Sequence, residues 1–227
     1  MSIATNLENI MERIEKASIK AGRDPKSVRL VAVTKTKPAD AVIEAAQAGH
    51  KIFGENYVQE LTAKAALVKE PVEWHFIGAL QSNKVKYIAG LVTLIHSVDR
   101  LSLAMEIEKQ WGKLGKICDI LVEVNVSGEK TKAGTSRAEA MQLVEGIAEM
   151  PHLRIKGLMT MPPFFDEPEL ARPYFKELRE LAAMIDARKI TNVEMRELSM
   201  GMSGDFEAAI EEGATLVRVG SAIFGSR

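Results

Sequence analysis

Short runs rich in β-branched and aromatic residues alternate with longer amphipathic stretches along almost the whole chain of 227 residues. The short runs have the pattern of strands, and the longer stretches repeat apolar residues at helical spacing. Eight such runs, each followed by a helix or a short crossover, are typical of a (β/α)8 barrel. The expected strands are residues 28–35, 51–56, 73–78, 94–98, 118–126, 154–161, 197–201 and 216–220. The expected helices are residues 39–48, 57–69, 100–114, 136–149, 169–188 and 204–212, with a weaker pattern at 82–90.

We therefore predict an α/β protein formed by one (β/α)8 TIM barrel with an extra N-terminal helix. A doubly wound open sheet is the alternative, although it usually has fewer strands. No linker rich in proline or glycine divides the chain, so residues 1–227 are expected to form a single domain. Gly22 follows the expected N-terminal helix, whose apolar face carries Leu7, Ile10, Met11, Ile14 and Ala17.

The charge composition restricts the class of ligand. Thirty basic and thirty-one acidic residues give a net charge of −1 and form no basic block. This argues against a nucleic acid or a membrane surface as partner and favours a small molecule. Charges interrupt the first twenty residues, unlike a signal peptide, and no apolar run is long enough to span a membrane. A cytoplasmic location is expected.

The cysteine and histidine residues indicate no metal site. The single cysteine, Cys118, lies in the apolar run "CDILVEVNV", where a buried and unreactive thiol in a reducing compartment is expected. The four histidines show neither the i, i+3 nor the i, i+4 spacing of zinc ligands. They are His50, His75, His96 and His152.

A lysine stands at the end of the first expected strand, in "LVAVTKTKPA". Because strand side chains alternate, Val31, Val33 and Lys35 share one face. If that face points inward, Lys35 lies at the carboxyl end of the barrel, where such barrels carry their sites. A lysine among apolar neighbours can act as an amine nucleophile toward a carbonyl, and an ion-paired lysine is the alternative. Lys37, beside Pro38, is expected to be a solvated loop charge.

Two glycine- and serine-containing segments near the C-terminus suggest a phosphate site. "SMGMSGDFEAAI" places Ser203 at a helix start, and "RVGSAIFG" places Gly220 and Ser221 after the last strand. Backbone N–H groups in such loops bind anions, and barrels often bind phosphate after their last two strands. Ordinary turns are the alternative explanation for each segment.

Arg218 and Asn56 are further candidates for this site. An arginine inside a barrel needs an acceptor or a ligand, and an ion pair with Glu123 would also satisfy it. Asn56 ends the second strand and could donate to a ligand or cap the following helix.

Other candidates have a simpler structural explanation. His75 could meet a ligand, but a hydrogen-bonded core histidine is the preferred interpretation. Met159 and Met161 could lie against a flat ring or fill the core. Lys130 and Lys132 are expected to be loop charges.

Six motifs taken together resemble the YggS/PROSC family of pyridoxal 5′-phosphate (PLP) homeostasis proteins. They are "VAVTKTKP", "FGENYVQE", "WHFIGALQSNK", "GLMTM", "SMGMSGDFEAAI" and "VRVGSAIFG", and they extend over nearly the whole chain. The resemblance implies a barrel like the N-terminal domain of alanine racemase, standing alone. It also implies that Lys35 carries PLP as a Schiff base, that Ser203, Gly220 and Ser221 hold the phosphate, that Arg218 faces the pyridine nitrogen, and that Asn56 lies in the pocket.

The resemblance implies a monomeric carrier or buffer that releases PLP to apo-enzymes without turnover. An arginine near the pyridine nitrogen disfavours its protonation and weakens the ring as an electron sink. The alternative is a small PLP-dependent racemase or decarboxylase with Lys35 as its only base. A lone lysine cannot easily protonate both faces of a carbanion. A Schiff-base aldolase without PLP is a third possibility.

Overall fold

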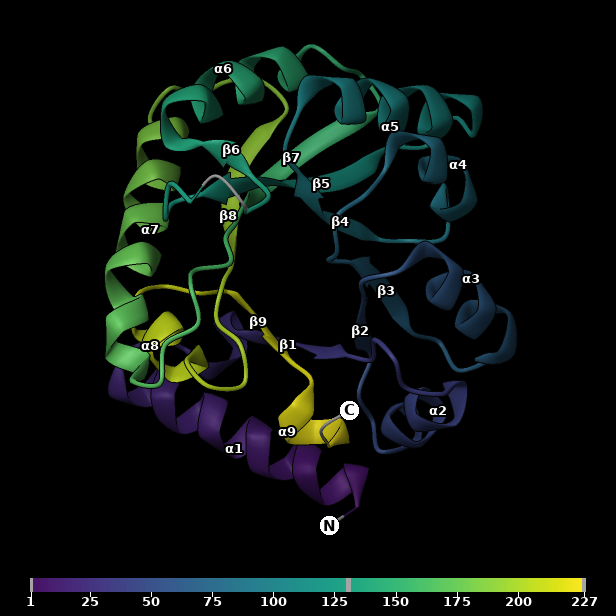
Figure 1. Cartoon of the computed structure of the whole chain (residues 1–227), viewed down its shortest axis with the longest axis vertical. Coiled ribbons are helices and arrows are strands. Elements are labelled where there is room, and N and C mark those ends of the chain that lie inside the picture. The colour runs from purple at the N-terminus through teal and green to yellow at the C-terminus, as the bar shows by residue number, and fades with distance from the viewer. Residues whose placement is uncertain (1, 130–131, 226–227) are drawn as a thin grey trace.

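A computed structural model describes residues 2–129 and 132–225. Parallel strands form a closed barrel, and helices surround it (Figure 1). In barrel order the strands are β1 (Arg29–Val33), β2 (Ile52–Glu55), β3 (Glu73–Phe76), β4 (Leu94–Val98), β5 (Cys118–Asn125), β7 (Leu153–Met159), β8 (Val193–Ser199) and β9 (Leu216–Val219). Pairing of β1 with β9 and of β4 with β5 closes the ring. The predicted α/β TIM barrel is confirmed.

The helices follow the strands in the predicted order. They are α1 (Ile3–Lys20), α2 (Ala39–Gln47), α3 (Val58–Leu67), α4 (Val85–Ile88), α5 (Leu101–Lys113), α6 (Arg137–Ala148), α7 (Arg172–Asp186), α8 (Phe206–Glu211) and α9 (Ser221–Phe224). The weak pattern at 82–90 forms a short 3₁₀ turn, Ser82–Lys84, followed directly by α4. Three described elements were not predicted: a 3₁₀ turn at Pro25–Ser27, the helix α9, and the two-residue strand β6 (Thr135–Ser136), which pairs with the end of β5.

The extra N-terminal helix is also confirmed. Ser2 caps it, because its Oγ accepts a hydrogen bond from the Thr5 N–H at 3.2 Å. Its buried face contacts α2, α8 and α9, so α1 belongs to the outer layer of helices (Figure 1). Met11 was predicted on that face but is 45% exposed, because it lies at the edge of the apolar stripe.

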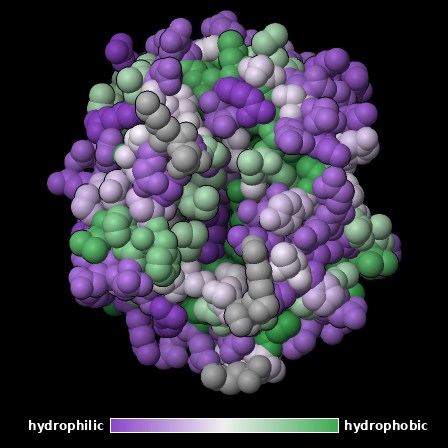
Figure 2. Space-filling model, viewed as in Figure 1, coloured by the Kyte–Doolittle hydropathy of each residue, from purple (hydrophilic) through white to green (hydrophobic). Residues whose placement is uncertain are grey.

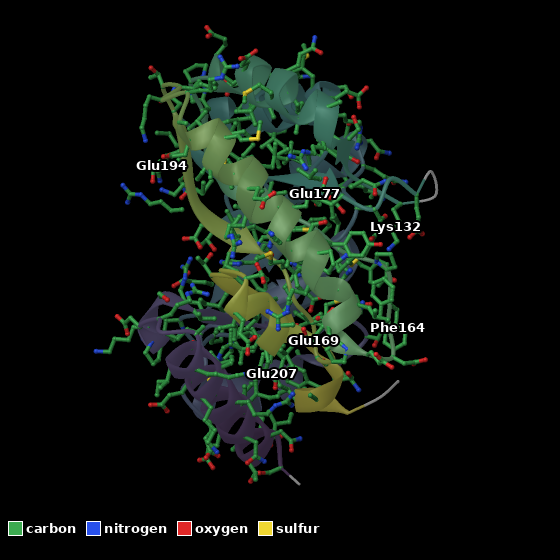
Figure 3. The ribbon with its side chains drawn as sticks, turned by 90° about the vertical axis from the view of Figure 1, so that its left-hand side faces the viewer. Lys132, Phe164, Glu169, Glu177, Glu194 and Glu207 are labelled. Carbon is green, nitrogen blue, oxygen red and sulfur yellow. The ribbon has the colours of Figure 1, made fainter. Side chains whose placement is uncertain are left out.

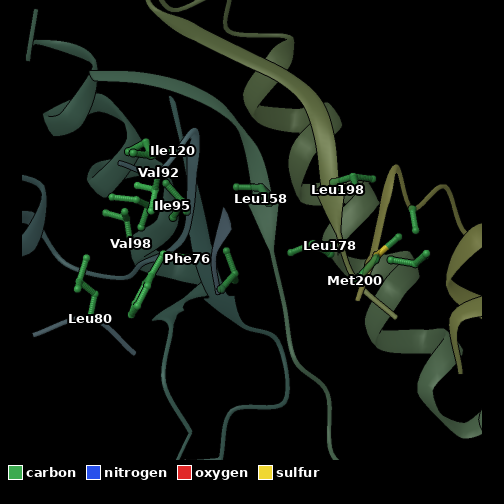
Figure 4. Packing of buried hydrophobic residues seen from close by; sticks show 14 of the residues in the cluster. Phe76, Leu80, Val92, Ile95, Val98, Ile120, Leu158, Leu178, Leu198 and Met200 are labelled. Carbon is green, nitrogen blue, oxygen red and sulfur yellow. The ribbon is translucent and has the colours of Figure 1, made fainter. Parts of the chain in front are cut away.

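The core has two parts. The larger part lies between the strands and the helices, and Figure 4 shows residues from several strands contributing to it. A smaller cluster fills the inside of the barrel and consists of Val31, Leu94, Leu121, Met159 and Leu216. This alternation of inner and outer side chains confirms that Val31 faces inward. Cys118 is buried, as predicted, and burial raises the pKa of its thiol.

Among the described residues, no helix has the length and apolarity needed to cross a membrane.

Candidate functional site

A pocket of about 330 Å³ opens at the carboxyl ends of the strands. Loops that follow β1, β2, β3, β7, β8 and β9 form its walls. Figure 2 shows the face of the molecule that is hollowed near its centre. The predicted residues that line this pocket are Lys35, Asn56, Ser203, Arg218, Gly220 and Ser221. Residues from distant parts of the sequence are therefore brought together as predicted.

Lys35 enters the pocket directly above the inner core. Val31 lies in the inner cluster, and Val33 and Lys35, two and four residues later on the same face, line the pocket. Lys35 is partly buried, and its ammonium group makes no hydrogen bond or ion pair with a described residue. A free amine inside a pocket is available to a ligand.

The turn after Lys35 is held by a charge network centred on the buried side chains of Lys64 and Glu55. Thr36 adopts a left-handed backbone with φ of 64°, which is unusual for a β-branched residue. Its N–H donates to Glu60 Oε2 at 2.7 Å. The Lys64 ammonium donates to Glu60 Oε2 at 3.0 Å and to Glu55 Oε1 at 2.6 Å. It also donates to the Thr34 carbonyl at 2.6 Å. The network fixes the backbone on both sides of Lys35.

Lys37 also lines the pocket. It lies in the loop after β1, as predicted, and it is partly exposed. The tight turn through Thr36, in which the Lys37 N–H donates to the Thr34 carbonyl at 3.0 Å, returns the chain toward the pocket.

Polar groups from two loops meet on one side of the pocket. Ser203 and Ser221 come from the loops after β8 and β9, and their hydroxyl oxygens are 3.3 Å apart. The N–H groups of Ser203 and Gly204 donate to no described residue. A Cβ on Gly204 would have open space around it, whereas a Cβ on Gly220 would lie 3.1 Å from the Val33 carbonyl oxygen. This side of the pocket can therefore bind an anion through hydroxyl and amide donors.

Arg218 faces inward from β9 and is 5% exposed. Its Nη1 donates to Ser199 Oγ at 2.6 Å, and its Nη2 donates to the Thr160 carbonyl at 2.9 Å. Burial lowers the pKa of the guanidinium to about 10, and the nearby carboxylates of Glu123 and Asp205 act in the opposite direction. The alternative of a direct ion pair with Glu123 is wrong, since no such contact joins the two described side chains. The cation still has N–H groups for a pocket ligand.

Asn56 has an unsatisfied acceptor in the pocket. Its Oδ1 is buried and accepts no hydrogen bond from a described residue. The alternative that Asn56 caps the next helix is wrong, because Tyr57 is the first flanking residue of α3 and the helix has no side-chain cap. A buried unpaired acceptor costs free energy unless a ligand or water satisfies it.

The two methionines are separated by the end of β7. Met159 lies in the inner cluster and is 2% exposed, so it does not line the pocket. Met161 lies beyond the end of the strand and lines the pocket together with Phe164 and Phe165. Phe165 stacks on Tyr174, whereas Phe164 is 82% exposed and projects from the edge of the molecule (Figure 3).

Some pocket residues were not predicted, namely Thr36, Ile77, Phe164, Phe165, Met202, Gly204, Asp205 and Gly225. Asp205 could have been found in the same motif as Ser203, and its Oδ1 accepts from the Met202 N–H at 2.6 Å. No local sequence pattern marks Phe164 or Phe165.

His75 and Lys132 do not line this pocket. His75 is a buried, hydrogen-bonded histidine, as preferred from the sequence, and its partner is His96 at 3.0 Å. The two rings therefore meet in the fold despite their spacing in sequence. Lys132 forms an ion pair with Glu129 at 3.7 Å, while Lys130 is outside the described residues. The described residues contain no cluster of carboxylate, histidine and cysteine side chains that could hold a metal ion.

Comparison with known proteins places the chain in a family. The profile of the alanine racemase N-terminal domain matches residues 5–227. The chain is 47% identical over 228 residues to a pyridoxal phosphate homeostasis protein of Aquifex aeolicus, covering 100% of this chain and 99% of the relative. It is 42% identical to the protein of the same name in Escherichia coli K12, covering 99% and 97%.

Solved structures agree with the fold. The structure of PipY from Synechococcus elongatus PCC7942 with PLP bound has a TM-score of 0.85 and 34% identity, and covers 99% of this chain and 100% of that one. An alanine racemase of Clostridium difficile 630 matches with a TM-score of 0.73 at 16% identity, covering 98% of this chain but 57% of the racemase. That second likeness concerns the fold alone. The profile match and the full-length relatives show that this chain belongs to the alanine racemase N-terminal domain family and, within it, to the pyridoxal phosphate homeostasis proteins.

Proposed function

We propose that this chain binds PLP as a Schiff base on Lys35 and takes part in intracellular PLP homeostasis, buffering or delivering the cofactor without turnover. The observation that carries the proposal is the pocket itself. It combines an unpaired lysine amine with hydroxyl and amide donors and a buried cation. When bound, PLP supplies an aldehyde carbon that reacts reversibly with primary amines.

The residues of the pocket fit the chemical groups of this cofactor. Lys35 supplies the amine, and the hydroxyls of Ser203 and Ser221, with the amide groups of Ser203 and Gly204, supply donors for the phosphate. Gly220 lets the loop after β9 lie close to Val33. The PLP-bound structure of the relative PipY, at 34% identity over the full chain, supports the choice of ligand.

Two further residues would complete the recognition of the ring. Arg218 offers N–H donors to an acceptor such as a pyridine nitrogen, and its position is set by Ser199 and Thr160. The buried Oδ1 of Asn56 needs a donor, which a ring hydroxyl could provide. Met159 is proposed to support the inside of the barrel rather than to touch the ring.

The arrangement favours storage over catalysis. With PLP bound, a donor-only guanidinium placed beside the pyridine nitrogen would keep that nitrogen unprotonated, which would weaken the ring as an electron sink. Among the described pocket residues, the groups able to exchange a proton with a ligand are Lys35, Lys37 and Asp205. The two lysines come from one loop, so both approach the ring from the same segment of chain. The full-length relatives are also named as homeostasis proteins.

The proposed setting is a monomer in the cytoplasm that transfers PLP to apo-enzymes. Transfer requires the pocket to be reached from outside, and the pocket opens at the carboxyl ends of the strands.

Binding is tested by adding PLP to the purified protein and recording the absorption of the bound cofactor. We expect a Schiff-base band in the wild type and none in Lys35→Ala, which should fold because one partly buried side chain contributes little core area. Circular dichroism and thermal unfolding without PLP provide the control for folding. Equal bands in both proteins would contradict the assignment of Lys35.

Turnover and delivery need separate measurements. Alanine in deuterated water should show negligible α-proton exchange with the PLP-loaded protein, and a PLP-free aminotransferase should regain activity when the loaded protein is added. Rapid exchange with racemisation would mean that the protein is an enzyme. If the loaded protein reactivates the aminotransferase no faster than free PLP does, the protein stores PLP but does not deliver it.

A further inference from the structure

Four buried polar side chains form a continuous hydrogen-bonded chain through the inside of the barrel. It begins at Arg218 in the pocket, whose Nη1 lies 2.6 Å from Ser199 Oγ. Ser199 Oγ lies 2.8 Å from His96 Nδ1, and His96 Nε2 lies 3.0 Å from His75 Nδ1. The four residues come from β9, β8, β4 and β3, and none is more than 5% exposed. Barrel interiors are usually filled by apolar side chains, so a buried polar row calls for an explanation.

The chain ends at a second cavity, of about 170 Å³, at the amino-terminal end of the barrel. His75 lines it together with Arg29 and Glu73, which begin β1 and β3, and with Glu197 of β8. Arg29 pairs with Glu197 at 2.6 Å, and Lys156, which also lines the cavity, pairs with Glu194 at 2.7 Å. The charged groups there are largely satisfied by one another. His75 Nε2, by contrast, makes no hydrogen bond with a described residue.

Arg218 determines the direction of every hydrogen bond in the chain. A guanidinium can only donate, so Ser199 Oγ must accept from it. The Ser199 hydroxyl proton then has one acceptor within reach among the described residues, His96 Nδ1. His96 therefore carries its proton on Nε2 and donates to His75 Nδ1, and His75 carries its proton on Nε2, which is left for the second cavity.

We propose that Ser199, His96 and His75 are positioning residues for Arg218, forming a one-directional hydrogen-bond relay that holds its guanidinium toward the cofactor pocket. The relay requires both imidazoles to be neutral, since a protonated ring would have no acceptor nitrogen. The surroundings meet this requirement. Burial, aided by Arg29, lowers the pKa of His75 to about 3. Burial is the largest cause that lowers the pKa of His96 well below its ordinary value. Electrostatic interactions with His75 and Arg218 act in the same direction.

The relay itself is tested without any cofactor. Nitrogen-15 NMR of protein labelled at histidine distinguishes the protonated from the unprotonated ring nitrogen. We expect His96 and His75 each to be a single neutral tautomer with the proton on Nε2 at neutral pH. A proton on Nδ1 of either ring, or a positive charge on either, would overturn the proposal.

Variants then test the link between the chain and Arg218. Ser199→Ala removes the group that connects His96 to Arg218, so the tautomer preference of His96, and of His75 beyond it, should be lost. Ser97→Ala is the matched control, because Ser97 is buried on the same strand as His96 and its Oγ has no partner among the described residues. A purely structural role for Ser199 would change stability but leave the His75 tautomer intact.

The consequence for the cofactor rests on the proposed function. Without Ser199 the guanidinium is no longer held toward the pocket, so its hydrogen bond to the ligand should weaken. Loss of most of one charge-assisted hydrogen bond corresponds to roughly tenfold weaker binding, so Ser199→Ala should bind PLP about tenfold more weakly than Ser97→Ala. Equal affinities of the two variants would overturn the positioning role. A wild-type protein with the expected tautomers but no affinity for PLP would instead overturn the proposed function. The hydrogen-bond relay would then still be supported, because the histidine tautomers are measured without PLP.

Discussion

At the scale of single residues, the pocket depends on groups that have no partner within the described protein. Lys35 has a free ammonium group, Asn56 Oδ1 is a buried acceptor without a donor, and the amides of Ser203 and Gly204 donate to no described residue. In a pocket reached from outside, such groups are available to a ligand. The two serine hydroxyls are the easiest of these groups to test.

Replacing Ser203 and Ser221 should affect the phosphate specifically. Each hydroxyl contributes about 0.5–1.5 kcal/mol to binding, so Ser203→Ala and Ser221→Ala should each weaken PLP binding about two- to tenfold. Binding of pyridoxal, which lacks the phosphate, should change little. Fluorescence or absorption titration with both ligands measures this, and equal losses for the two ligands would place the phosphate elsewhere.

Glu123 gives the protein a predictable pH dependence. Burial, with a further contribution from Asp99, raises the pKa of this carboxyl from 4.5 to about 7, and Arg218 opposes the shift. A raised pKa means that the folded state favours the protonated form, so its contribution to stability is present below pH 4.5 and is lost as the pH rises through 7. The full loss is on the order of 3 kcal/mol.

Glu123→Gln should remove this loss because an amide does not ionise. At pH 8 the variant should gain stability relative to the wild type, and near pH 4 the two should be similar. Urea unfolding at several pH values measures the difference. A constant difference between the two proteins across this range would show that Glu123 does not titrate as expected.

At the scale of elements, β1, β2 and α3 are joined by the network around Lys64. This ammonium is almost completely buried and bonds the Thr34 carbonyl together with the carboxylates of Glu55 and Glu60. Thr34 Oγ1 also donates to Glu55 at 2.6 Å. The network thereby connects the helix to the turn that carries Lys35.

Lys64→Met should be strongly destabilising because it leaves the Glu55 carboxylate buried without a cation. The expected cost is about 3–5 kcal/mol, as for other broken buried ion pairs. The double variant Lys64→Met/Glu55→Leu should recover most of this loss, since an apolar replacement of a buried pair is often neutral. Chemical unfolding provides the measurement, and a single variant as stable as the wild type would refute this role for the pair.

Patterns within elements were predictable from the sequence, whereas contacts between elements were not. Alternation along β1 was sufficient to place Lys35 in the pocket. The start of β8 at Val193 was missed because the first part of this strand is only partly buried and lacks a clear apolar pattern. The contact between His75 and His96 depends on the alignment of β3 with β4, which no local motif encodes.

At the scale of the whole molecule, barrel closure needs irregular pairing on one side. The register shifts between Ile155 and Gly157 where β7 meets β8. At Gly157 the neighbouring backbone is so close that an added Cβ would overlap the Glu197 carbonyl oxygen, at 1.8 Å. Glycine within a strand often marks such a close approach.

Gly157→Ala should therefore force β7 and β8 apart. Overpacking of this kind costs about 1–3 kcal/mol or more, and the melting temperature should fall accordingly. Gly204→Ala is a suitable control for stability, since its added Cβ would meet no atom within 4 Å. Similar melting temperatures for the two variants would contradict the importance of this contact.

The central claim is that the barrel brings one amine, that of Lys35, to the aldehyde of PLP. Reduction of the PLP-loaded protein with borohydride fixes the cofactor to the lysine that holds it, and peptide mapping by mass spectrometry identifies that lysine. We predict a single pyridoxyl adduct on Lys35. An adduct mainly on Lys37, which also lines the pocket, or on Lys84, which lies outside it, would contradict the account.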